Sequence, residues 1–310
     1  MSGQDPKAYW RNGSLSAQKI SLAFLAYAAG DAFGVQFEFA PKILGEIKHE
    51  LIEKPGWPFG AVSDDTLLSI LTVEALANNA LEDAQRNFLV SLQAAIPQLR
   101  GLGPTTRSAL GLPVKEVELS QVGQSNGGMM RTALLGLAFA PTETELRRNW
   151  IGQLTAATHP FPKAQDCAQI LAAGFSAALG SSAIEATLDS IIEEVNNNLE
   201  LSDQVLVAMN SWRTWTPPEV GVSNDSLETL LAVLYVVSRA TSTKDAYSIA
   251  CKLGGDTDTV AALAGSLYAA TICDFQAFFK IEWLTDVDWD GALGLSAAIE
   301  ILIDRRVNNV

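Results

Sequence analysis

The sequence predicts an all-α protein. Apolar residues recur at intervals of three and four along most of the chain, and the alternating runs typical of strands are scarce. The predicted helices are also rich in alanine, which lets helices pack closely. No linker, internal repeat or low-complexity tract divides the chain. We therefore expect a single domain over residues 1–310, built as a bundle of many helices.

The first predicted helix, Ser16–Ala29, carries its apolar residues at the spacing of one helix face, with Ile20, Phe24, Leu25 and Ala28 as examples. A second helix with the same spacing covers Asp64–Ala77. The remaining predicted helices are Lys163–Ala178, Ile184–Val195, Leu227–Ala240, Lys244–Leu253, Thr259–Cys273 and Ala292–Ile303.

One further helix is predicted from its start signal. Thr142 and Glu145 have the spacing of a capping box, in which each side chain bonds a free backbone N–H at the helix start. The helix that follows should reach about Ala157.

The composition argues against several classes of protein and of metal site. The net charge of −14 disfavours nucleic-acid binding, which needs basic patches. Three widely spaced cysteines argue against a disulfide framework, and only two histidines leave too few ligands for a His/Cys zinc site. Any bound metal should therefore have oxygen ligands, as Mg²⁺, Mn²⁺ and Ca²⁺ do. The polar N-terminus and short apolar stretches predict a cytoplasmic protein that does not enter a membrane.

Two acidic clusters each open a predicted helix. They read Ser63-Asp64-Asp65-Thr66 and Gly254-Gly255-Asp256-Thr257-Asp258-Thr259. Each cluster can serve as a helix cap, because Ser, Thr and Asp side chains accept hydrogen bonds from free N–H groups. A cap needs only one such residue, however, and adjacent carboxylates repel each other unless a cation neutralises them. If the clusters meet, their four carboxylates suit two divalent cations about 3.5–4 Å apart.

A third segment runs from the end of the first predicted helix. Asp31 follows Gly30 there and suits either a cap or a satisfied polar group. Glu38 lies among Phe37, Phe39 and other apolar residues. A carboxylate in such a setting pairs, binds a metal or acquires a raised pKa that suits acid–base work, and exposure to solvent is the alternative.

Two more segments are suited to binding an anion. The Gly-rich turn Ser125-Asn126-Gly127-Gly128 runs into Met129-Met130-Arg131 and offers backbone N–H groups to a phosphate. Arg131 suits a phosphate or a structural ion pair equally well. His159 follows a helix and is either structural or a hydrogen-bond partner for a phosphate or sugar.

Taken in this order, the motifs resemble those of the ADP-ribosylglycohydrolase family. That family includes the enzyme that reactivates ADP-ribosylated dinitrogenase reductase, and hydrolases of ADP-ribosylarginine and ADP-ribosylserine. The resemblance covers a motif-bearing core of about residues 16–273, and the two acidic clusters are its most specific parts. It implies an all-α fold with a loop-built centre for two divalent cations, usually Mg²⁺ or Mn²⁺.

The resemblance also implies roles for particular residues. Glu38 and Asp65 would be catalytic, and Ser63 stands where relatives commonly have threonine. The implied metal ligands are Ser63, Asp64, Asp65, Asp256, Asp258 and Thr259. The implied contacts to the ADP-ribose are made by Asp31, Ser125, Asn126, Gly127, Gly128, Met129, Arg131 and His159. Four aromatic residues either stack on adenine or pack in the core, namely Trp57, Phe59, Trp212 and Trp215.

The implied activity is metal-dependent hydrolysis of the glycosidic bond between ADP-ribose and an acceptor. Protein ADP-ribosylarginine is the expected substrate and ADP-ribose the product, with ADP-ribosylserine or a small ADP-ribosylated metabolite as alternatives. A catalytically inert ADP-ribose-binding module is the alternative function, although the complete set of candidate ligands argues against it. Residues 101–120 show no diagnostic pattern, so the acceptor stays open.

Overall fold

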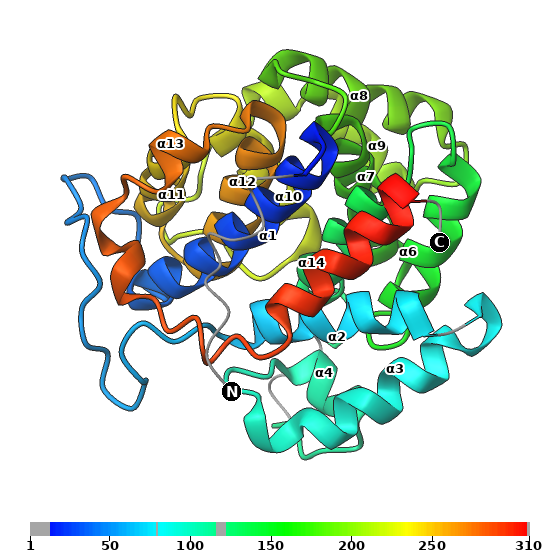
Figure 1. The fold of residues 1–310 in the computed structure, drawn as a ribbon, viewed down its shortest axis with the longest axis horizontal. Helices are drawn as coiled ribbons and strands as arrows, with labels where there is room; N and C mark the ends of the chain where they lie inside the picture. The colour runs from blue at the N-terminus through cyan, green and yellow to red at the C-terminus, as the bar shows by residue number, and fades with distance from the viewer. Residues whose placement is uncertain (1–12, 79, 116–121, 309–310) are drawn as a thin grey trace.

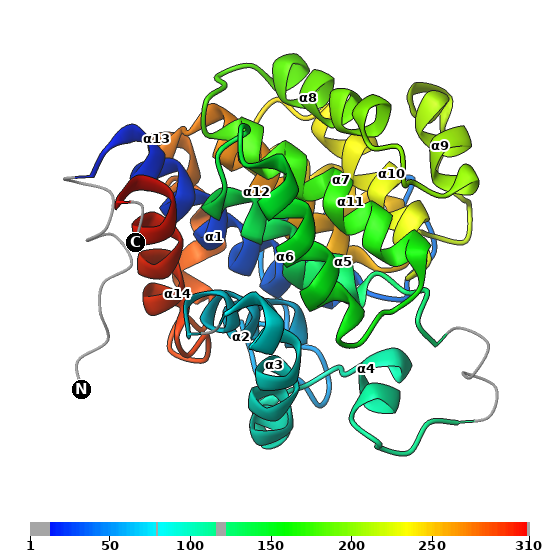
Figure 2. The ribbon, with the colours of Figure 1, turned by 90° about the vertical axis from the view of Figure 1, so that its right-hand side faces the viewer.

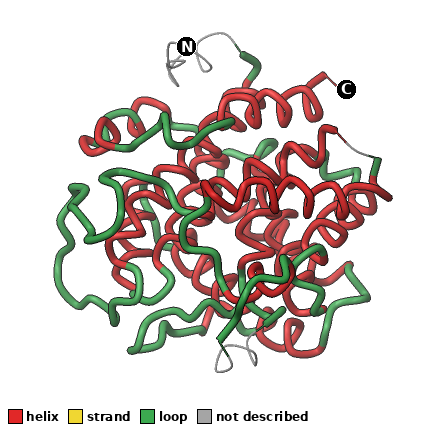
Figure 3. The backbone as a smooth tube through the Cα atoms, turned by 90° about the horizontal axis from the view of Figure 1, so that it is seen from below, coloured by secondary structure: helices red, strands yellow, loops and turns green. Residues whose placement is uncertain are grey.

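The structure is a computed structural model that describes residues 13–78, 80–115 and 122–308. Every regular element in these ranges is a helix, as the red and green tube of Figure 3 shows. Extended pairing in the described chain is limited to two isolated bridges, Ser125 with Asp225 and Val222 with Gly255. The all-α prediction is confirmed.

The α-helices in chain order are α1 (Leu15–Gly34), α2 (Asp64–Asn78), α3 (Leu81–Ala95), α4 (Pro104–Ala109), α5 (Gly127–Thr132), α6 (Thr144–Ala156), α7 (Pro162–Ala178), α8 (Ile184–Asn197), α9 (Asp203–Asn210), α10 (Ser226–Val237), α11 (Thr243–Leu253), α12 (Thr257–Ile272), α13 (Phe275–Phe278) and α14 (Leu295–Ile303). Short 3-10 turns are η2 (Val35–Phe37), η3 (Ile96–Gln98), η5 (Ala133–Ala138), η6 (Trp212–Thr214) and η7 (Glu282–Asp286), and a π turn, η8 (Asp304–Asn308), follows α14.

Helices α1 and α12 form the centre of the molecule and lie side by side (Figure 1). Nearly every residue of both helices is buried, so each is apolar around its whole circumference. Their close approach depends on two glycines of α1. A Cβ on Gly30 would lie 2.6 Å from the Ala261 carbonyl oxygen, and one on Gly34 would lie 2.4 Å from the Asp258 Cα. This contact places the start of α12 against the end of α1.

A buried lysine joins three helices at the other end of this pair. Lys19 of α1 donates to the carbonyl oxygens of Ala178 (2.7 Å), Thr271 (3.1 Å) and Ser181. Ala178 ends α7, and Thr271 lies in the last turn of α12, where carbonyl groups have no partner within the helix. The ammonium group therefore satisfies helix ends that burial would otherwise leave unpaired.

The outer helices surround this centre in two groups. Helices α2, α3 and α4 lie together on one side of the molecule, and α8 and α9 lie on the opposite side (Figure 2). The buried side chains of the described residues form one continuous hydrophobic cluster. The long connection between α1 and α2 has no helix after residue 37 and leads directly to the acidic start of α2.

Several predicted boundaries need correction. The first helix does not end near Ala29 but continues to Gly34, because Gly30 and Gly34 serve helix packing and adopt ordinary helical backbone angles. The last helix starts at Leu295, since Gly294 has a φ of +91°. Helices α3, α4, α9 and α13 were not predicted from the sequence.

The predicted capping box before α6 is wrong. Helix α6 begins at Thr144, and its cap residue Glu143 makes no capping hydrogen bond. The Glu143 carboxylate instead accepts from the Ala140 N–H (2.8 Å), and the Thr144 hydroxyl donates to the Pro141 carbonyl (3.0 Å). These two bonds turn the loop back before the helix, so Thr142 does not reach the cap position.

One helix is longer and more apolar than the sequence analysis recognised. Residues Leu15–Phe37 reach the length and hydropathy of a membrane span, but 89% of the 18-residue apolar window within them is buried inside the fold. Such burial is typical of the central helix of a globular domain. The predictions about membranes and cellular compartment stay predictions.

Candidate active site

The loop after α1 is tied to the loop before α12. The Phe39 N–H donates to the Gly255 carbonyl (2.8 Å), and the Gly255 N–H donates back to the Ala40 carbonyl (2.7 Å). Gly254 and Gly255 have φ values of +70° and +77°, and a Cβ on Gly255 would lie 1.9 Å from a backbone oxygen of the next loop. This close approach requires glycine. It brings the segment that contains Glu38 against the second acidic cluster.

The loop before α12 pairs on its other side with the loop before α10. The Asp256 N–H donates to the Val222 carbonyl (2.9 Å), and the Asn126 N–H donates to the Asn224 carbonyl (2.8 Å). Four loop segments therefore lie next to one another across the site, in the order 38–42, 254–256, 222–226 and 123–126.

Asp31 positions the first acidic cluster. It is fully buried in α1, and its carboxylate accepts from the Ser63 N–H (3.0 Å), the Thr66 N–H (3.1 Å) and the Thr66 hydroxyl (2.5 Å). The Ser63 hydroxyl accepts from the Asp65 N–H (3.0 Å) and so caps α2. A side chain of α1 thus satisfies the free N–H groups at the start of α2 and directs Asp64 and Asp65 into the site.

The two acidic clusters, whose meeting the sequence left open, lie in contact. The Thr259 hydroxyl donates to the Asp65 carboxylate (2.9 Å), a contact between residues 194 positions apart. Asp256 occupies the N-cap position of α12, but its side chain makes no capping hydrogen bond. Its carboxylate accepts instead from the Asn126 side-chain amide. The Asp258 carboxylate accepts from the Thr259 N–H (2.9 Å) at the start of α12, and the Thr259 hydroxyl joins the two clusters through Asp65.

These residues line a pocket of about 500 Å³. It contains the carboxylates of Glu38, Asp64, Asp65, Asp256 and Asp258. The opposite wall is formed by the start of α4, the Gly-rich turn and His159. Ten of the predicted site residues line it, namely Glu38, Asp64, Asp65, Ser125, Asn126, Gly127, His159, Asp256, Asp258 and Thr259.

The carboxylates of this pocket repel one another. Burial raises the pKa values of Asp64, Asp65 and Asp258 well above their ordinary range, and neighbouring carboxylates raise them further. Neither these three nor Asp256 forms an ion pair with a described lysine or arginine. Positive charge from a bound ligand would therefore favour the ionised forms of Asp64, Asp65 and Asp258.

Glu38 has a different environment. Burial raises its pKa, and the ammonium group of Lys54 opposes that shift. The Lys54 ammonium lies 3.1 Å from the Glu38 carboxylate and also donates to the Val35 carbonyl (2.8 Å). Glu38 is thus held at the edge of the acidic cluster by a residue of the long α1–α2 connection.

A chain of hydrogen bonds fixes His159 in the opposite wall. The buried Arg131 donates to the Thr158 hydroxyl (2.8 Å), which lies 2.7 Å from His159 Nδ1. Since the Thr158 hydroxyl accepts from Arg131, we infer that it donates its own proton to Nδ1 and that the ring proton lies on Nε2. His159 Nε2 then donates to the Ser125 hydroxyl (3.0 Å), which in turn donates to Thr105 (3.2 Å).

His159 is neutral in this arrangement. Burial, helped by the charge of Arg131, lowers its pKa to about 3. The ring therefore acts as a fixed hydrogen-bond partner of Ser125 across the neutral pH range. It is not suited to be a general acid near pH 7.

The donor chemistry of the acidic cluster fits divalent cations. Every donor is a hard oxygen, from a carboxylate or from the hydroxyl of Thr259, as Mg²⁺ and Mn²⁺ prefer. In the described ranges, no three His, Cys, Asp or Glu side chains converge tightly enough to form a finished metal-binding group. The oxygen donors of the pocket are therefore chemically suited to divalent cations.

Five predicted site residues lie outside the pocket. Arg131 is 1% exposed, donates to the Leu154 carbonyl (2.7 Å) and lies over the Phe88 ring. Arg131 and Asp31 thus support the site from behind the pocket lining, and their predicted contact with substrate stays a prediction. Ser63, Gly128 and Met129 are also buried behind the lining.

The four aromatic candidates for adenine stacking also lie elsewhere. Trp57 and Phe59 border a separate hollow of about 390 Å³. Trp212 is buried beneath Arg213, and Trp215 packs edge-on against Tyr235. None of the four lines the acidic pocket.

The structure adds residues that sequence reasoning missed. Thr105, Thr106 and Arg107 come from the start of α4, and Phe39 and Met130 lie next to predicted residues. Thr105 to Arg107 fall in the region without a diagnostic pattern, of which residues 116–120 lie outside the described chain. An arginine beside two threonines after a Gly-Pro turn was the only available signal.

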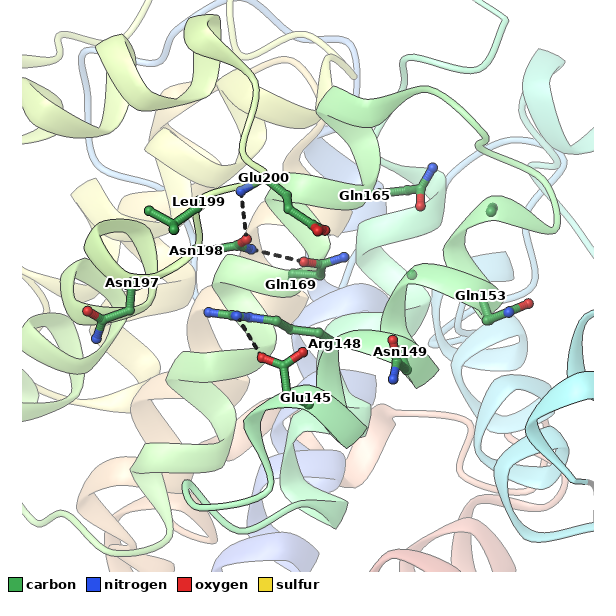
Figure 4. Close-up of a pocket in the computed structure, with 12 residues that line it drawn as sticks. Glu145, Arg148, Asn149, Gln153, Gln165, Gln169, Asn197, Asn198, Leu199 and Glu200 are labelled. Atoms are coloured by element: carbon green, nitrogen blue, oxygen red, sulfur yellow. Dashed lines mark hydrogen bonds and ion pairs between the residues drawn. The ribbon is translucent and has the colours of Figure 1, made fainter.

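A larger hollow of about 630 Å³ lies between α6, α7 and the end of α8 (Figure 4). Carboxamide side chains dominate its lining, and several residues bond one another. Asn198 donates to Gln169 (3.2 Å), and Arg148 pairs with Glu145 (3.1 Å). None of the predicted site residues lies there, so the acidic pocket is the candidate active site.

Comparison with known proteins decides the family. The model of the ADP-ribosylglycohydrolase family matches residues 14–303. The chain belongs to the ADP-ribosylglycohydrolase family. It is therefore a glycosyl hydrolase, and the acidic pocket at the junction of α1, α2 and α12 is its candidate active site.

Individual relatives are distant. This ADP-ribosylglycohydrolase is 25% identical over 291 residues to ADP-ribosylarginine hydrolase Tri1 of Pseudomonas putida (strain GB-1), covering 86% of this chain and 73% of that protein. It is 23% identical over 320 residues to the uncharacterized protein YegU of Escherichia coli (strain K12), covering 89% and 95% of the two chains. A solved structure described as an ADP-ribosylglycohydrolase-related protein complex superposes with a TM-score of 0.72 at 24% identity, over 94% of this chain and 99% of the other, which confirms the fold.

Proposed function

We propose that this ADP-ribosylglycohydrolase uses two divalent cations, Mg²⁺ or Mn²⁺, to release ADP-ribose from arginine side chains of proteins. The observation that carries the proposal is the contact of Thr259 with Asp65, which joins the two acidic clusters in one pocket. The likeness to an ADP-ribosylarginine hydrolase supports arginine as the acceptor. Among the described residues, the ion pair at the pocket joins Lys54 to Glu38 and leaves Asp64, Asp65, Asp256 and Asp258 to another source of positive charge, which supports metal binding.

The two sides of the pocket have separate tasks. Asp64, Asp65, Asp256, Asp258 and Thr259, with Ser63 behind them, would hold the cations. When bound, the cations supply the positive charge that offsets the carboxylates and holds the hydroxyls of the distal ribose. The opposite wall receives the diphosphate through Arg107 and the Gly-rich turn, whose N–H groups and Ser125 hydroxyl suit an anion.

Glu38 performs the proton transfer. Its raised pKa and its position at the edge of the acidic cluster suit a general base that takes a proton from the attacking water. The water oxygen bonds to the anomeric carbon as the bond to the acceptor nitrogen breaks, through an oxocarbenium-like transition state. The proton passes to the departing guanidine nitrogen, so atoms and charge balance. Asp65, which lines the same pocket, orients the ribose.

The substitution Glu38→Gln tests this assignment. Loss of the proton acceptor should lower kcat for ADP-ribosylarginine by roughly 10²–10⁴-fold. The dissociation constant of ADP-ribose, measured by calorimetry, should change much less. A variant that keeps its kcat but loses ADP-ribose affinity would make Glu38 a binding residue only.

The acceptor is tested separately with the wild-type protein. Hydrolysis of ADP-ribosylarginine should be faster than hydrolysis of ADP-ribosylserine at equal concentrations. Preference for the serine linkage would retain the reaction class but overturn the arginine assignment.

A further inference from the structure

Phe39 is unusual in two independent respects. Its φ is +66°, in the left-handed region that aromatic residues rarely adopt, and its side chain is 82% exposed although it lines the acidic pocket. A conformation of this kind is unfavourable by roughly 1–3 kcal/mol and persists where surrounding structure imposes it, often at functional sites. The fold therefore keeps a large apolar ring in water at the mouth of the site.

The backbone around Phe39 is fixed by the same bonds that place Glu38. The Phe39 N–H donates to Gly255, and the Ala40 carbonyl accepts from Gly255. The Ala40 N–H donates to the Phe37 carbonyl (3.1 Å), which closes the turn. The backbone position of Phe39 is therefore set by the loop that carries the second acidic cluster, and the exposed ring contributes little packing of its own.

The order of the loops gives Phe39 its place relative to substrate. The segment 38–42 lies at one end of the series of four loops, and the segment 123–126 lies at the other end. The diphosphate-binding groups Ser125 and His159 belong to that other end. With the diphosphate at Ser125 and His159, as the proposed function has it, Phe39 would lie at the end of the pocket away from the diphosphate.

We propose that Phe39 is a specificity-determining residue whose ring receives the cationic, planar guanidinium group of the acceptor. This assignment rests on the proposed function. A guanidinium stacks on an aromatic face and is attracted by its quadrupole, whereas a serine oxygen offers neither a charge nor a plane.

The test compares substitutions of Phe39 on two substrates. Phe39→Leu keeps bulk but removes the π face, so kcat/KM for ADP-ribosylarginine should fall roughly 3- to 30-fold. Hydrolysis of ADP-ribosylserine and the dissociation constant of ADP-ribose should stay within about twofold of wild type, since neither involves the guanidinium. Phe39→Tyr should retain the preference for arginine. Phe59→Leu is the matched control, because Phe59 is an exposed ring of the same connection outside the pocket.

A further variant separates selectivity from folding. Phe39→Gly relieves the positive φ and should unfold at the wild-type temperature or above, while it loses the preference as Phe39→Leu does. Equal losses on both substrates, or weaker ADP-ribose binding as expected of an adenine platform, would overturn the assignment. If Phe39→Leu keeps the wild-type preference for ADP-ribosylarginine over ADP-ribosylserine, the assignment of Phe39 is overturned and the proposed function stands. Failure of the wild-type protein to hydrolyse either substrate would overturn the proposed function and this assignment together.

Discussion

At the scale of single residues, the site is organised around buried carboxyl groups. Burial and repulsion between neighbouring carboxylates both disfavour their ionised forms. Asp65 and Asp258 are buried, and each adjoins at least one other carboxylate of the cluster. Their pKa values are raised in the folded chain, so the folded state binds protons more tightly than the unfolded state. In the absence of cations, stability should therefore fall as pH rises from about 4, the ordinary aspartate pKa, through the raised values.

The substitution Asp258→Asn tests this electrostatic strain. In EDTA at pH 7.5 it should raise the midpoint of thermal unfolding, since each pKa unit of upward shift corresponds to about 1.4 kcal/mol. The same variant should lose hydrolytic activity and the stabilisation that Mg²⁺ or Mn²⁺ gives the wild type. The exposed Asp203→Asn is the control and should show no such gain. A lower unfolding midpoint for Asp258→Asn would contradict the account.

The tautomer of His159 is a second prediction at this scale. The chain has only two histidines, so ¹⁵N-histidine labelling gives two ring systems that His49→Gln distinguishes. His159 should carry its proton on Nε2 and stay neutral from pH 5 to 8, as its pKa of about 3 requires.

Thr158→Val removes the donor to Nδ1 and should weaken or reverse that tautomer. It should also weaken ADP-ribose binding severalfold, because the Ser125 hydroxyl loses its fixed partner. Thr158→Ser is the matched control and should resemble wild type. If the His159 ring of the wild-type protein carries its proton on Nδ1, the inferred donor–acceptor direction of the hydrogen bonds from Arg131 to Thr105 is wrong.

At the scale of elements, the crossing of α1 and α12 aligns the two acidic clusters. Gly34 ends α1 against the backbone of Asp258, and the Thr257 hydroxyl donates to the Gly34 carbonyl (2.8 Å). Asp31, one turn earlier, holds the start of α2. The geometry of the site thus depends on how closely two helices approach.

The substitution Gly34→Ala tests this dependence. Its Cβ would lie 2.4 Å from the Asp258 Cα, so the helices must separate, at an expected cost of about 1–3 kcal/mol in the free energy of unfolding. Activity should fall more than tenfold because Asp258 moves with α12. Gly45→Ala is the control, since its Cβ would meet nothing within 4 Å. If Gly34→Ala has wild-type stability and activity, the close contact of α1 with α12 is not what aligns the two acidic clusters.

Elements were predictable where periodicity was strong. The helices corresponding to α2, α7 and α11 were predicted within one residue at each end. Helix α3 was missed even though Ala84, Phe88 and Leu92 form a buried stripe at intervals of four. The end of α1 was misplaced because a glycine that contacts another helix has the same sequence signal as a glycine that ends one.

At the scale of the whole molecule, the sequence identified both acidic clusters, since carboxylates next to hydroxyls are conspicuous along the chain. It could not show that Thr259 would reach Asp65, because that contact depends on the packing of α1, α2 and α12. It also could not show that Arg131 lies behind the wall, because burial is a property of the assembled fold. Arg107 was missed because the sequence around the short helix α4 has no diagnostic pattern.

The most direct test of the central claim is release of ADP-ribose from ADP-ribosylarginine in the presence of Mg²⁺, Mn²⁺ or EDTA. The account predicts release by the wild-type protein with a divalent cation, and none in EDTA. Asp256→Ala should abolish cation-dependent release while circular dichroism shows unchanged helicity. Equal release in EDTA, or full activity of Asp256→Ala, would contradict the claim that the joined acidic clusters form a metal-dependent active site.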